Sequence, residues 1–179
     1  SITDFRITGK MFLVDKNNDY LIGNLITGLA LAFVVVGILM GLLFRQLKMV
    51  LISFIPNIIP LIIAGAVMGY FDITLKATTS IIFTIAFGIA VDDTIHFLSR
   101  FKLEQLKGAG QVMAMRRTFV ETGKAISFTT IILLSGFSTL IFSDFTVTYY
   151  IGLLIGLTLA SALIADLLLM PLLLYRFYR

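Results

Sequence analysis

The chain has 179 residues, of which 59% are hydrophobic and 13% are charged, and its mean hydropathy is +1.03. Soluble domains carry about 25% charged residues, so this composition excludes an ordinary water-soluble enzyme, a disordered tail and a nucleic-acid-binding module. The absence of cysteine excludes disulfides and thiolate metal sites, and the net charge of +4 matters less than where its Lys and Arg residues lie.

The apolar residues gather in stretches long enough to cross a bilayer as helices, which takes roughly 20 residues each. Residues 1–20 come before the first stretch and begin without an initiator Met or a signal segment, so we expect them to be the last piece of an outer domain of a longer protein. No stretch alternates polar and apolar residues as a barrel strand does. The sequence therefore predicts an all-α, polytopic bundle of five transmembrane helices, with spans at about 21–44, 49–71, 77–99, 125–142 and 149–175.

Basic residues predict the orientation of these spans. Of the 14 Lys and Arg residues, four lie on one side of the predicted bundle, namely Arg6, Lys10, Lys16 and Lys76, which leaves ten on the other. Because Lys and Arg are enriched in cytoplasmic connections, we expect a plasma-membrane (inner-membrane) protein with its N-terminus outside and its C-terminus in the cytoplasm.

The connection 100–124 is the longest between two predicted spans. Within it, Val112, Met115 and Phe119 recur at helical spacing beside two arginines, a pattern typical of an amphipathic helix on the cytoplasmic surface. A basic, solvated loop that only sets the topology is the alternative.

The third predicted span contains three ionisable residues, Asp92, Asp93 and His96. An ionisable side chain at membrane depth costs roughly 2.5–3.5 kcal/mol on insertion scales, so it marks a candidate functional site. At about 100° per residue, Asp92 and His96 share one helix face and Asp93 points away from it. Gly88 lies on the face of Asp92, where a neighbouring helix can approach closely.

Two adjacent carboxylates in a medium of low dielectric constant do not both ionise readily, so they titrate as a coupled pair. With the His96 imidazole one turn away, we interpret Asp92 and Asp93 as a site of proton uptake and release. Three alternatives remain: acids that line a water-filled vestibule, a histidine that lies at the interface, and a metal site. Because further ligands are missing from the pattern, the sequence predicts neither a metal nor a cofactor.

Other polar residues in the spans have two interpretations each. Asp166, in the fifth span, joins the proton path or hydrogen-bonds a neighbouring helix. Thr129 and Thr130, in the fourth span, relay protons or form contacts between helices.

The second span contains Pro56, Asn57 and Pro60. Two prolines four residues apart interrupt the backbone hydrogen bonds of a helix, and the freed groups and the Asn57 amide must find partners inside the bundle. The pattern predicts a deformable helix, which acts as a hinge or as a static kink.

The run GIAVDDTIHFLSRF resembles the GxxxDD helix of the resistance-nodulation-division (RND) superfamily, and is most similar to its MMPL-type and exporter members, which are related to Patched and sterol-sensing-domain proteins. The segments FIPNIIPLIIAGAVMGYFDITL, ETGKAISFTTIILLSGFSTLIFSDF and GLLIGLTLASALIADLLLMPLLL resemble other helices of the same family, in the same order. The likeness covers nearly the whole chain.

The resemblance implies one half of a twelve-helix bundle, here helices eight to twelve, with 1–20 as the end of a periplasmic domain. It also implies export of hydrophobic or amphiphilic molecules, driven by the proton motive force, with Asp92 and Asp93 as the proton site. Drug-efflux members pair such acids with a lysine of the other half, and no span here contains a lysine. We therefore expect the partner charge in a missing N-terminal half or in another copy, with an oligomer surrounded by membrane lipids.

Two alternatives to transport remain. One is a lipid-sensing, sterol-sensing or scaffold bundle without active transport. The other is an intramembrane aspartyl protease that uses Asp166 with Asp92 or Asp93, but the run GIAVDD differs from the GxGD expected of such enzymes. We therefore expect a protein that is not an enzyme.

Overall fold

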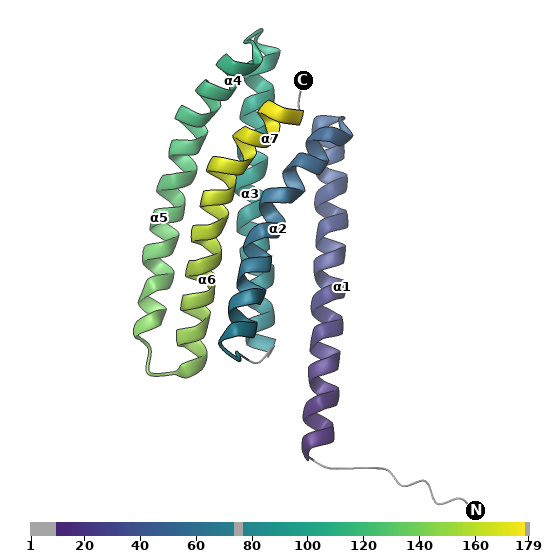
Figure 1. Cartoon of the computed structure of the whole chain (residues 1–179), viewed down its shortest axis with the longest axis vertical. Helices are drawn as coiled ribbons and strands as arrows, with labels where there is room; N and C mark the ends of the chain where they lie inside the picture. The colour runs from purple at the N-terminus through teal and green to yellow at the C-terminus, as the bar shows by residue number, and fades with distance from the viewer. Residues whose placement is uncertain (1–9, 74–76, 178–179) are drawn as a thin grey trace, which may run out of the picture.

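The computed structural model describes residues 10–73 and 77–177 and shows long helices that run side by side (Figure 1). The first three are α1 (Lys10–Phe44), α2 (Leu47–Tyr70) and α3 (Ala77–Leu106). The fourth combines α4 (Gln111–Thr118), the π-helical turn η1 (Phe119–Gly123), α5 (Lys124–Ser138) and the 3₁₀ turn η2 (Thr139–Phe142). The fifth combines α6 (Thr146–Ile164), the π-helical turn η3 (Ala165–Leu169) and α7 (Met170–Phe177). Five helices of the described chain are long and apolar enough to cross a membrane, which confirms the predicted all-α bundle.

The helix ends differ from the predicted spans at two places. Helix α1 begins at Lys10, before the predicted start of the first span, while residues 1–9 lie outside the described residues. Most of the connection 100–124 is helical, because α3 continues to Leu106 and the next helix begins at Gln111. Val112, Met115 and Phe119 therefore lie on helical segments, as their spacing predicts, and these segments continue directly into α5.

Two apolar clusters form the core, one in each half of the bundle. The first lies toward the end of the bundle that carries Arg45 and Arg100, called the basic end below, and includes Met49, Phe97 and Leu174. The second lies toward the opposite end and includes residues of α2, α3 and α6, namely Met68, Ile82 and Leu159. Between the two clusters, each of the second, third and fifth helices carries buried polar residues, namely Ser53, Asn57, Thr94 and Asp166.

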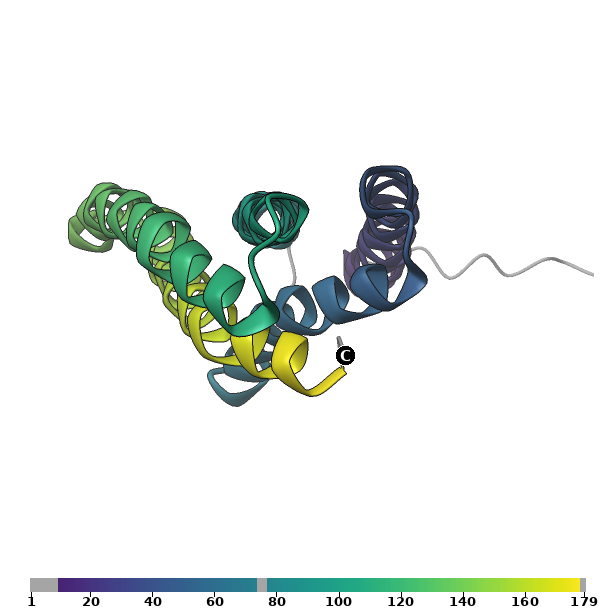
Figure 2. The same cartoon turned by 90° about the horizontal axis from the view of Figure 1, so that it is seen from above.

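Helices α2, α3 and α6 pack against one another at the centre, whereas α1 and α5 lie at the two sides (Figure 2). In an apolar 18-residue stretch of the first span, 6% of the residues are buried, and in that of the fourth span 11% are buried. The corresponding share is 44–50% in the other three spans. Much of the apolar surface of these two helices therefore faces outward, toward lipid or another part of the protein.

Helix α2 bends along its length, from an oblique course at the basic end to a course alongside α3 and α6 (Figure 1). Pro56 and Pro60 both lie inside this helix, and the lost N–H donors explain the bend. Asn57, between them, is fully buried and has partners inside the bundle, as predicted.

The pair of α5 and α6 crosses closely at Gly152. A Cβ atom there would lie 2.8 Å from the Leu140 Cβ and 2.9 Å from the Phe137 carbonyl oxygen. Glycine therefore sets how near the two helices come, as small residues do in membrane helix pairs. At Gly88, by contrast, a Cβ atom would meet nothing within 4 Å, so no helix of the described chain approaches there.

Candidate functional site

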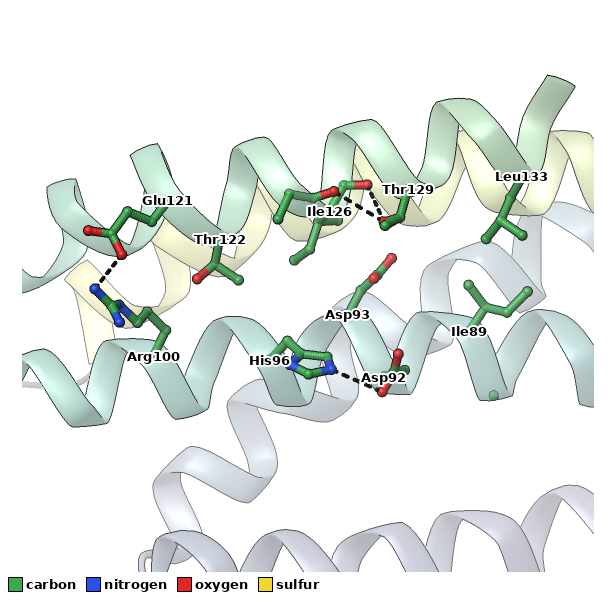
Figure 3. Close-up of a pocket in the computed structure, with 12 residues that line it drawn as sticks. Ile89, Asp92, Asp93, His96, Arg100, Glu121, Thr122, Ile126, Thr129 and Leu133 are labelled. Carbon is green, nitrogen blue, oxygen red and sulfur yellow. Dashed lines mark hydrogen bonds and ion pairs between the residues drawn. The ribbon is translucent and has the colours of Figure 1, made fainter.

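The acidic residues of α3 border a pocket between α3 and the fourth helix (Figure 3). The pocket has a volume of about 650 Å³ and is open on one side. Its wall on α3 consists of Gly88, Ile89, Asp92, Asp93, His96 and Arg100, and its wall on the fourth helix consists of Glu121, Thr122, Ala125, Ile126, Thr129 and Leu133. Carboxylate, imidazole, guanidinium and hydroxyl groups thus surround one space within otherwise apolar helices.

Asp92 and His96 form a pair on the open side of α3. The His96 Nε2 lies 3.5 Å from the Asp92 Oδ1, and the two side chains are 68% and 70% exposed in this chain. Their spacing of four residues places them on one face, as the helical period predicts. Asp93 is half-buried and points toward the fourth helix (Figure 3). The two adjacent acids therefore have different surroundings.

The two threonines predicted as site residues on the fourth helix, Thr129 and Thr130, have different surroundings. Thr129 lines the pocket, and its hydroxyl is within hydrogen-bond distance of the Ile126 and Ala125 carbonyl oxygens of its own helix, at 3.0 and 3.2 Å. Thr130 is buried and lies outside the pocket lining, and its Oγ1 has no partner within the described part of the chain. The structure thus places Thr129, and not Thr130, beside the acidic pair.

A network of ion pairs lies at the basic end of the pocket. Arg100 of α3 pairs with Glu121 of η1, and its guanidinium is also 3.1 Å from Glu104. The buried Glu104 carboxylate accepts further hydrogen bonds from Lys107 and Arg117, each at 3.1 Å. This network was not predicted from the sequence, where these residues fall in the connection 100–124, although Arg100 and Glu104 already have the spacing of a helical ion pair.

Asp166 lies apart from the pocket, on the π-helical turn η3, and is 1% exposed. The Thr94 hydroxyl of α3 lies 2.9 Å from its Oδ1 and 3.2 Å from the Asn57 Oδ1 of α2. The second carboxyl oxygen, Oδ2, is buried and has no partner among the described residues. Thr94 was missed in the sequence, where the only signal is a hydroxyl residue directly after the two aspartates.

The arrangement provides two kinds of carboxyl group for proton exchange. Asp92 and Asp93 border an open pocket that water can enter, whereas Asp166 is enclosed on the other side of α3. An aspartyl protease needs two carboxyl groups that share one proton. Here the Oδ1 of Asp166 is bonded to Thr94 and its Oδ2 has no partner in the described structure, so the geometry does not support that alternative.

Comparisons with known proteins agree with this architecture. The chain is 30% identical over 138 residues to a membrane protein of Methanocaldococcus jannaschii, an alignment that covers 76% of this chain and 36% of that protein. The chain thus spans about a third of the length of this relative, and no solved structure matches it. The model of the MMPL family matches residues 3–177, nearly the whole sequence. This multi-pass membrane chain therefore belongs to the MMPL family of the RND superfamily.

Proposed function

We propose that the protein exports hydrophobic or amphiphilic molecules, such as lipids or drugs, at the expense of the proton motive force, and that this chain supplies the proton-coupling transmembrane half. Membership of the MMPL family indicates a transporter of the RND type and supports the general class. The proton-coupled mechanism rests on the site itself. The orientation that we propose has the basic end in the cytoplasm, because Lys and Arg residues gather there.

The observation that carries the proposal is the placement of Asp92 and Asp93 on α3, a helix apolar enough to cross a membrane, beside an open pocket of about 650 Å³. Carboxylates at membrane depth are costly, and they mark ion or proton pathways in membrane proteins. A pocket of this size admits water, which is needed to bring protons to the acids. His96 adds an imidazole beside these acids, with its Nε2 at 3.5 Å from the Asp92 Oδ1.

The open face of α3 supports a further proposal, that another part of the protein covers the site. Asp92 and His96 are more than half exposed, and nothing lies within 4 Å of a Cβ atom at Gly88. Lipid would offer this carboxylate and this imidazole no polar partner beyond each other, which is unfavourable in hydrocarbon. We therefore propose that a missing half of the transporter, or a second copy, packs on this face and provides a counter-charge to Asp92 and Asp93, because Arg100 of the same pocket already pairs with Glu104 and Glu121.

The test is transport by the full-length protein in everted membrane vesicles, with an acyl-labelled fluorescent phospholipid and a lipophilic cationic dye as probes. The variant Asp92→Asn with Asp93→Asn is expected to lose uptake of the probes driven by an imposed proton gradient, because neither amide takes up a proton. Normal transport by this variant at normal membrane levels would contradict the proposal. Transport that persists after a protonophore collapses the gradient, or its absence from the wild type, would favour the lipid-sensing or scaffold alternative.

A further inference from the structure

A buried polar layer joins the three central helices between the two apolar clusters. It consists of Asn57 on α2, Thr94 on α3 and Asp166 on η3, which are each at most 1% exposed. Only the hydroxyl of Thr94 contacts both of the others. Anything that changes the hydrogen bonding of this hydroxyl therefore acts on α2 and on the fifth helix together.

The layer has one donor for two acceptors. The Thr94 hydroxyl carries one proton, and it lies 2.9 Å from the Asp166 Oδ1 and 3.2 Å from the Asn57 Oδ1. The Asn57 amide meets Thr94 through its oxygen, Oδ1, whereas its Nδ2 is directed to its own helix, where it donates to the Ser53 carbonyl oxygen at 2.7 Å. Which acceptor receives the Thr94 proton thus depends on the protonation state of Asp166.

When Asp166 is ionised, it takes the Thr94 proton, because hydrogen bonds to charged acceptors are the stronger ones. The Asn57 Oδ1 then remains buried without a donor, which is unfavourable. When Asp166 is protonated, its own O–H donates to the Thr94 oxygen, and the Thr94 hydroxyl is free to donate to Asn57. All three side chains are then joined in one chain of hydrogen bonds.

We propose that Thr94 is a positioning residue that transmits the protonation of Asp166 to Asn57 and thereby changes the bend of α2. The proposal rests on the proposed function, since it takes Asp166 as a group that exchanges protons during transport. It assigns a conformational role to a buried carboxyl group that lies outside the pocket of Asp92 and Asp93.

Helix α2 is suited to respond at this point. Pro56 and Pro60 flank Asn57 and have no N–H, so the carbonyl groups four residues before each proline lose their helical hydrogen bonds. The local backbone is therefore held less by hydrogen bonds within the helix and more by contacts with neighbouring helices. A changed hydrogen bond at Asn57 acts where the helix is least stiff.

The charged surroundings of Asp166 are simple among the described residues. Asp93 of α3 directly precedes Thr94 and acts on Asp166 through its charge, while the other ionisable residues of α3 are Asp92, His96, Arg100, Lys102 and Glu104. Helix α2 has a single charged residue, Lys48, at its first turn, and α7 has Arg176 in its last turn. A pH response of this layer therefore involves Asp166 and, through its charge, Asp93.

The test measures the bend of α2 by the distance between two spin labels in the full-length protein in lipid nanodiscs. Cysteines for the labels replace the exposed residues Leu51 on α2 and Leu103 on α3, and this chain contains no other cysteine. The distance distribution is expected to change between neutral and acidic pH in the wild type. In Thr94→Val this change should be lost, and in Thr94→Ser, which restores the hydroxyl, it should return.

Two further variants make the result specific. Asp166→Asn has a permanent amide donor for Thr94, so the labels should show the acidic-pH distance at every pH. Thr158→Val is the matched control, because Thr158 is equally buried and its hydroxyl contacts only carbonyl groups of its own helix, at 2.8 and 2.9 Å. This control should respond to pH as the wild type does.

The inference is overturned if the wild type shows no change with pH, if Thr94→Val or Asp166→Asn keeps the change, or if Thr158→Val loses it as well. These failures are distinct from failure of the proposed function. If Asp92→Asn with Asp93→Asn abolishes proton-driven transport while Thr94→Val leaves the α2 response intact, the transporter assignment stands and only the coupling through Thr94 is wrong.

Discussion

Asp92 and Thr94 lie two residues apart on α3 but face opposite environments, since the Asp92 side chain is 70% exposed and Thr94 is fully buried. A single helix thus presents one acid to an open pocket and one hydroxyl to a closed polar layer. Through Thr94, the same helix contacts the buried Asp166 of the fifth helix. This double placement makes α3 the element on which both proton-related sites depend.

We expect Asp93→Asn alone to reduce proton-driven transport of the fluorescent probes by at least tenfold in everted vesicles. Asp93 is half-buried and points into the pocket, and its amide replacement takes up no proton. The matched control is Asp144→Asn, an exposed acid in the short turn between the last two spans, which should transport normally. Equal transport by the Asp93 variant and the control would remove Asp93 from the proton path.

Replacement of Gly152 by alanine should destabilise the pair of α5 and α6 by about 1–3 kcal/mol, the usual cost of overpacking. The added Cβ would lie 2.8 Å from the Leu140 Cβ and 2.9 Å from a backbone oxygen, neither of which can move freely. Gly156→Ala is the control, because its added Cβ would meet its first neighbour at 4.0 Å. Thermal unfolding of the purified protein in detergent should show a lower midpoint for the first variant only.

The variant Glu104→Gln is expected to lower the thermal unfolding midpoint of the protein. Glu104 accepts from Lys107 and Arg117 and pairs with Arg100, so its loss leaves three cationic groups near one another without their shared anion. Glu121→Gln removes a more exposed acid that pairs with Arg100 and should have the smaller effect. A larger effect of the Glu121 change would show that the buried carboxylate is not the centre of the network.

Thr130→Val should leave both stability and transport close to wild type. The Thr130 hydroxyl is buried without a partner in the described chain, so its removal breaks no hydrogen bond and relieves an unsatisfied group. The measurements are the unfolding midpoint and probe uptake. A large loss of transport at normal stability would instead show that Thr130 belongs to a proton relay.

Local properties of the sequence explain what was predicted about the site. The helical period places Asp92 and His96 on one face and Asp93 on another, and this needs no knowledge of the neighbouring helices. The partner of Asp166 was not predictable in this way. Thr94 lies 72 residues away along the chain, and the contact depends on how α3 and the fifth helix are rotated about their axes.

The connection 100–124 shows the same distinction for the fold. Its helical spacing at Val112, Met115 and Phe119 was visible in the sequence, whereas its continuity with α5 was not. From the sequence, the charges of this segment fitted either an amphipathic surface helix or a solvated loop. In the structure, Glu104 of α3 pairs with Arg100 of the same helix and with Arg117 of α4, so these charges join two helices.

The sequence by itself determined the number of spans, their helical form and the position of the acidic pair, because hydropathy and helical period act over about 20 neighbouring residues. Only the tertiary structure decided which acids are open and which are enclosed. That outcome depends on packing at Gly152, on the bend at Pro56 and Pro60, and on which helix faces meet, and these are relations between residues far apart in the chain.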